Sequence, residues 1–67
     1  MDLNLLNDVT VTVVMSDLQA EALAQLVKRI GWVEIRQNAV DDLEAYEMRD
    51  AVYRLQKALG EAGYAPR

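Results

Sequence analysis

The sequence predicts an α+β fold: one N-terminal β-strand followed by two long α-helices with a short helix between them. Residues 9–15 alternate at period two, whereas residues 18–30 and 45–62 repeat their apolar side chains at helical spacing. A chain of 67 residues has room for one small domain. We therefore expect a single β-α-α(-α) domain over residues 9–67, preceded by an N-terminal extension over residues 1–8.

The strand is expected over Val9–Met15, where β-branched residues place one wholly apolar face at alternate positions and an uncharged, threonine-rich face between them. A lone strand leaves backbone N–H and C=O groups unpaired on both edges. Residues 32–37 can supply a second strand, two copies of Val9–Met15 can pair across a two-fold axis, or the edges can stay open for a partner. Of these arrangements we favour the homodimer.

The first long helix has clear start and stop signals. Ser16 is expected as its N-cap, with Gln19 completing a capping box. Two basic residues precede Gly31, which we expect in the left-handed conformation that ends many helices. Trp32 would then pack on Val27, as the residue after such a glycine commonly does.

The segment Trp32–Val40 fits either a short helix or a strand, and we favour the helix because its polar residues are poor strand formers. Asp41 is expected to cap the last helix, with Glu44 completing an acidic capping box. At the other end, Gly63 and Tyr64 predict the same glycine-based ending as before.

Two leucines on the apolar helix faces, Leu26 and Leu55, are expected in the core. The aromatic residues are interpreted as core edges and helix-end contacts; they are Trp32, Tyr46, Tyr53 and Tyr64.

The composition excludes several function classes. Without cysteine or histidine the chain cannot form a disulfide, a zinc-thiolate site, or a Ser-His-Asp or Cys-His arrangement. The net charge of −4 argues against a protein that binds nucleic acid or anionic membranes directly. The sequence shows no signal peptide and no membrane-spanning run. We therefore expect a cytoplasmic binding protein that is not an enzyme and uses no cofactor or metal.

The acidic excess is local. Five acidic residues lie close together in the sequence, with a single basic residue, Arg49, among them. They are Asp41, Asp42, Glu44, Glu47 and Asp50. Glu34, from the preceding segment, can add to their surface. Acids are favourable in the first turn of a helix and keep a small protein soluble. Alternatively, acids one turn apart imitate phosphate spacing and form a strip for a basic partner surface. A divalent-metal site is a third interpretation, although the alternating ligands of a calcium loop are missing.

A strand followed by helices is similar in outline to the ribbon-helix-helix repressors. Those proteins read DNA with side chains on the exposed face of paired strands. Here that face offers only Thr10, Thr12 and Val14, with neither lysine nor arginine. The similarity therefore implies a strand-paired structural or regulatory homodimer that does not read DNA.

A second resemblance is carried by two strings, I-G-W-x-E over residues 30–34 and N-A-V-D-D-x-E-A-Y over residues 38–46. They resemble a family of short acidic proteins carried by phages, plasmids and other mobile elements of proteobacteria. Some such proteins resemble anti-CRISPR inhibitors that occupy DNA-binding surfaces. The resemblance implies a DNA-mimicking inhibitor of a type I CRISPR surveillance complex, with Glu34 and the five clustered acids as its contacts.

Overall fold

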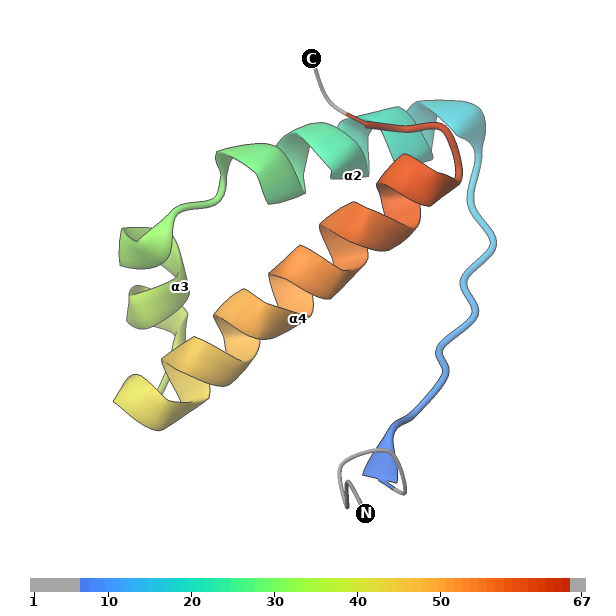
Figure 1. Cartoon of the computed structure of the whole chain (residues 1–67). Coiled ribbons are helices and arrows are strands. Elements are labelled where there is room, and N and C mark those ends of the chain that lie inside the picture. The colour runs from blue at the N-terminus through green and yellow to red at the C-terminus, as the bar shows by residue number, and fades with distance from the viewer. Residues whose placement is uncertain (1–6, 66–67) are drawn as a thin grey trace.

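The computed structural model describes residues 7–65, and within that range the protein is all-helical. Helix α2 spans Asp17–Arg29, α3 spans Trp32–Asn38 and α4 spans Asp42–Glu61. The long helix α4 packs against both others, and α3 forms the corner that joins the far end of α2 to the start of α4 (Figure 1). None of the helices in the described range is long and apolar enough to cross a membrane. The predicted extension over residues 1–8 lies mostly outside the described residues.

The predicted α+β class is wrong, because Val9–Met15 does not form a strand. This segment is an extended arm that leaves the start of α2 and runs away from the helices (Figure 1). Its four valines are between 65% and 94% exposed. A strand needs a neighbour to satisfy its backbone groups, and the one candidate in the chain, residues 32–37, lies within helix α3. The alternation therefore marks an apolar segment that has no partner within the described part of its own chain.

The start of α2 confirms the predicted capping box. The backbone N–H of Gln19 donates to Ser16 Oγ at 3.1 Å, and the backbone N–H of Ser16 donates to Gln19 Oε1 at 2.9 Å. Because the first N–H groups of a helix lack partners within it, these two bonds fix where α2 begins.

The predicted ending of α2 is wrong. Gly31 has an extended backbone with φ −107°, so it is not left-handed. Ile30 ends α2 instead, and Gly31 is the N-cap of α3, where its N–H donates to a carboxylate oxygen of Glu34 at 3.2 Å. Because α3 starts directly after Gly31, this glycine caps the start of α3 and does not end α2.

Helix α4 begins and ends largely as predicted. Asp41 caps it by accepting the backbone N–H of Glu44 at 2.9 Å. The expected reciprocal bond is not formed, because the Glu44 carboxylate accepts the N–H of Val40 instead. At the C-terminus, Gly63 has φ 96°, and the N–H of Tyr64 donates to the carbonyl of Leu59 at 2.8 Å. The glycine-based ending is therefore confirmed.

That ending brings Tyr64 back to the start of α2, where its hydroxyl donates a hydrogen bond to the carboxylate of Asp17. This bond is the main cause that raises the pKa of Tyr64 above its ordinary value; desolvation and the negative charges of Asp17 and Glu21 add to it. This side-chain contact therefore joins the C-terminal end of α4 to the start of α2.

The core is small, and three of its six buried residues are alanine. Leu26 and Leu55 are 58% and 39% exposed, so the prediction that both lie in the core is wrong. The buried cluster between α2 and α4 consists of Ala24, Val27 and Leu59, and Leu26 and Leu55 lie outside it. The buried residues within the described range are Ala20, Ala24, Val27, Ile35, Ala45 and Leu59.

Candidate protein-binding surface

The acidic residues gather at one end of the molecule, where α3 meets the start of α4. We call residues 32–50 the acidic corner. Its six carboxylates and two guanidinium groups leave a formal charge of −4, which equals the charge of the whole chain. The rest of the protein is therefore neutral in sum, and the excess negative charge belongs to this corner.

Most of these carboxylates also serve the local structure. Asp41 caps α4, Glu44 holds the N–H of Val40, and Glu34 holds the N–H of Gly31. Two others pair with arginines: Asp42 with Arg36 at 2.8 Å and Asp50 with Arg49 at 3.2 Å. These contacts support the interpretation that acids are favourable at a helix start.

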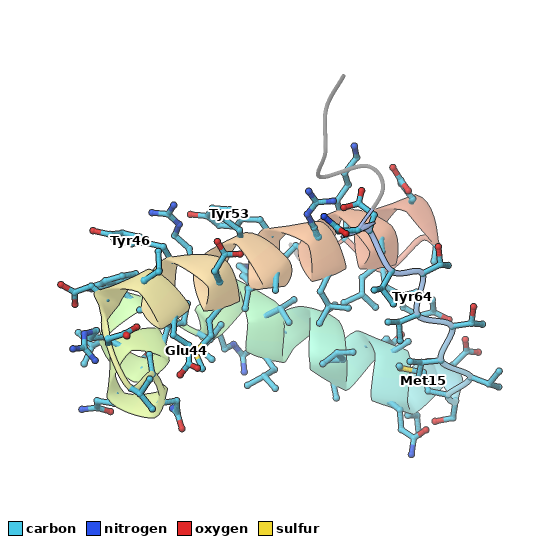
Figure 2. The ribbon with its side chains drawn as sticks, turned by 90° about the horizontal axis from the view of Figure 1, so that it is seen from below. Met15, Glu44, Tyr46, Tyr53 and Tyr64 are labelled. Carbon is cyan, nitrogen blue, oxygen red and sulfur yellow. The ribbon has the colours of Figure 1, made fainter. Side chains whose placement is uncertain are left out.

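The predicted acidic strip is not a straight row. A step of three residues falls short of a full helical turn by about 60°, so the acids at positions 41, 44, 47 and 50 wind around α4. Figure 2 shows Glu44 on the edge of α4 that faces α2, whereas Tyr46 and Tyr53 lie on the opposite edge. Glu47 and Asp50 are exposed on α4 and, unlike Asp41 and Glu44, hold no helix-start N–H group.

The structure adds an aromatic cluster that the sequence interpretation missed. The rings of Trp32 and Tyr46 lie 5.1 Å apart and tilted by 31°. The guanidinium of Arg49 lies over the ring of Tyr46, 5.1 Å from its centre. Tyr53 follows two turns further along α4, and all three rings are about half exposed. The interpretation of these rings as core edges and helix-end contacts does not place them on one outer face. The signal for that face is the seven-residue spacing of Tyr46 and Tyr53, with Arg49 between them.

A shallow groove of about 140 Å³ runs beside this cluster, between the start of α3 and the middle of α4. Trp32, Arg49 and Tyr53 contribute to its walls, together with the aliphatic side chains of Ile35 and Val52. We call Trp32, Tyr46, Arg49 and Tyr53 the aromatic patch. Exposed tryptophan, tyrosine and arginine are the residues most enriched where proteins bind one another tightly.

The carboxylates of the corner are spread around a helix start. All of them are exposed except that of Glu44, which is partly buried. Within the described residues, no group of three acids is arranged to hold a metal ion. An open surface with aromatic anchors and a net negative charge can contact a complementary basic surface.

Comparison with known proteins identifies a family. No curated protein and no solved structure matches the chain significantly. The profile of a family of unknown function, DUF7706, matches residues 1–67. The chain therefore belongs to this family.

Proposed function

We propose that the protein is a binding module that docks its acidic corner and aromatic patch onto a basic surface of another protein. The observation that carries the proposal is the coincidence of the two features: the net charge of the chain lies beside a half-exposed cluster of tryptophan, tyrosine and arginine. Electrostatic complementarity speeds and orients association, while buried aromatic side chains supply most of the affinity.

In its sharper form, the basic surface is one that binds nucleic acid, and the protein competes with the phosphate backbone. We propose the DNA-binding surface of a type I CRISPR surveillance complex as that target. The support for this form is the resemblance of residues 30–34 and 38–46 to small acidic proteins of mobile elements, together with the local negative charge. On this proposal, the protein protects a phage from a CRISPR-immune host.

The test separates charge from structure by sparing the capping residues. Glu47→Lys combined with Asp50→Lys reverses two exposed charges without removing a helix cap. The matched control is Glu21→Lys combined with Glu61→Lys, which changes the net charge equally but outside the corner. We expect the first pair to lose phage protection and binding to the purified complex at least tenfold, and the control to retain both.

The aromatic patch is tested in the same assays. Tyr46→Ala and Tyr53→Ala each remove one exposed ring, and a hot-spot side chain costs about 2 kcal/mol or more of binding energy when truncated. Circular dichroism checks that the variants keep their helices. Wild-type binding and protection by the corner double variant would refute the acidic contact, and wild-type behaviour of both tyrosine variants would refute the aromatic one.

The second candidate function is a structural or regulatory homodimer whose acids only keep it soluble. The contacts that Asp41, Asp42, Glu44 and Asp50 already make within the chain favour it. It predicts that charge reversal at the corner leaves activity intact, whereas changes in the arm abolish it.

A further inference from the structure

A set of exposed apolar side chains lies outside the acidic corner, on the arm and along α2. It consists of the arm, residues 9–15, and of a stripe on α2 formed by Leu18, Ala22 and Leu26. Val14 is 94% exposed and Leu18 is 77% exposed, although both are large aliphatic residues. Between Val9 and Met15 there is no charged residue. Large exposed apolar surface of this kind is typical of an interaction site.

The chain is more open than a compact protein of its length, so it leaves enough surface for a standard interface. Its radius of gyration is 13.4 Å, whereas a compact chain of this length has about 11 Å. The chain exposes 5737 Å², and a compact protein of the same mass exposes about 4,300 Å². The difference, about 1,400 Å², exceeds the roughly 800 Å² that each partner contributes to a standard interface.

The small core would gain stability from a partner that is always present. Three of the six buried residues are alanine, and the described range contains no buried polar network that could add stability. Domains of this size commonly need a disulfide, a metal or oligomerisation to be stable. The sequence contains no cysteine and no histidine. A second copy of the chain is the partner that is always available in equal amount.

The pattern of the arm points to the same partner. Residues 9–15 carry no charge, and in an antiparallel pair centred on Thr12 all seven lie opposite one another, with Val9 opposite Met15. A pair centred on Val11, about which Val-Thr-Val-Thr-Val is symmetric, would instead place Asp8 opposite Val14. Within the described residues, no main-chain hydrogen bond joins residues 9–15 to another segment. An extended, uncharged segment with free backbone groups is suited to pairing with itself across a two-fold axis.

We propose that the protein is a homodimer in which the two arms lie antiparallel, centred on Thr12, and the α2 stripes extend the interface. In this alignment Thr12 lies opposite the partner's Thr12, and Val11 opposite the partner's Val13. Thr–Thr and aliphatic cross-chain pairs of this kind are favourable. The fold of each protomer stays all-helical, and the arm gains its backbone partners only in the dimer.

This inference does not depend on the acidic corner binding anything, because the arm leaves α2 at the end remote from that corner (Figure 1). It does supply the association that the second candidate function requires. The two proposals can therefore fail separately. A protein that dimerises but whose acidic corner binds nothing would refute only the proposed function, and a monomer whose corner binds its target would refute only the dimer.

The first experiment measures mass in solution. Sedimentation equilibrium of the full chain, over a dilution series from 100 to about 1 μM, covers the range in which specific dimers form. We expect twice the chain mass of 7.6 kDa at the higher concentrations. Val11→Glu combined with Val13→Glu brings four acids together at the paired centre and should halve that mass, whereas Gln37→Glu on α3 should not. A wild-type monomer throughout the series overturns the proposal.

The second experiment tests the register by introducing single cysteines into a sequence that contains none. Residues directly opposite in an antiparallel pair have Cα atoms about 5 Å apart, which a disulfide can bridge. Thr12→Cys should therefore cross-link into a covalent dimer under mild oxidation. Val9→Cys alone should cross-link at least tenfold more slowly, because it lies opposite the partner's Met15, and mixing it with Met15→Cys should restore the rate. Equal cross-linking of Thr12→Cys and Val9→Cys overturns the proposed register, and with it the paired arms.

Discussion

The side-chain amide of Gln56 donates a hydrogen bond to the main-chain carbonyl of Val27, and so links the middle of α4 to the last turn of α2. Carbonyl groups in the last turn of a helix have no partner within the helix. The left-handed glycine that often satisfies them is missing here, because Gly31 belongs to the start of α3. A side chain from another helix therefore completes the end of α2.

Replacing this glutamine tests that contact. Gln56→Ala leaves a partly buried carbonyl without its donor and should lower the free energy of unfolding by about 1–2 kcal/mol. Urea unfolding followed by circular dichroism measures the change, at one fixed protein concentration. Gln37→Ala, at an exposed position of α3, is the control and should change stability little. Equal effects of the two substitutions would mean that the bond to Val27 stabilises nothing.

Leu59 and Leu43 lie on the same helix and test the core. Leu59 is 8% exposed and packs beside Ala24 and Val27, whereas Leu43 is 72% exposed. We expect Leu59→Ala to cost about 2–5 kcal/mol and Leu43→Ala to stay within about 0.5 kcal/mol of the wild type. Thermal and urea unfolding report both values. A variant of Leu59 as stable as that of Leu43 would show that the core lies elsewhere.

Two glycines near the end of α4 should respond in opposite directions. Gly63 has φ 96°, where a Cβ atom is strained, so Gly63→Ala should destabilise by about 1 kcal/mol. Gly60 is helical, and a Cβ atom there would meet only Ala65 Cβ at 4.0 Å, an ordinary contact. Gly60→Ala should therefore stabilise by about 0.5–1 kcal/mol. Melting temperatures that shift in the same direction would contradict the assigned helix end.

The bond between Tyr64 and Asp17 predicts a dependence on alkaline pH. Because the folded protein raises the pKa of Tyr64, the contact is fully present below the ordinary tyrosine pKa, near 10, and is lost as pH rises through the higher folded value. Ultraviolet titration of tyrosinate should show Tyr64 ionising at a pH above its ordinary pKa.

Asp17→Ala should bring the pKa of Tyr64 back toward its ordinary value, since the hydrogen bond to Asp17 is the largest cause of the shift. Glu21→Ala is the matched control and should move that pKa much less, because Glu21 acts only through its charge. An unchanged titration in Asp17→Ala would show that this hydrogen bond is not formed in solution.

The local signals in the sequence predicted the helices well. Ser16, Asp41 and Gly63 each satisfy or terminate backbone groups through contacts within a few residues, and such contacts are encoded locally. The short helix predicted within Trp32–Val40 is also confirmed, and it spans Trp32–Asn38. The placement of the acids at one helix start followed directly from these boundaries.

What failed depended on contacts between distant segments. Val9–Met15 has a strand pattern, but a pattern cannot supply the second strand. The role of Gly31 depended on whether α3 began immediately after it. Leu26 belongs to an apolar stripe, but the α2 residues that pack in the buried cluster with Leu59 of α4 are Ala24 and Val27. The aromatic patch was missed for the same reason, since Trp32 and Tyr46 meet only across the α3–α4 corner.

The alanine interior restricts how this protein can change over generations. At Ala20, Ala24 and Ala45 the side chain is already the smallest that keeps good helix propensity. A larger residue there would force the helices apart, and glycine would weaken the helix itself. Neutral substitutions are therefore expected to accumulate on the outside, so that the surfaces can adapt to new partners while the interior stays fixed.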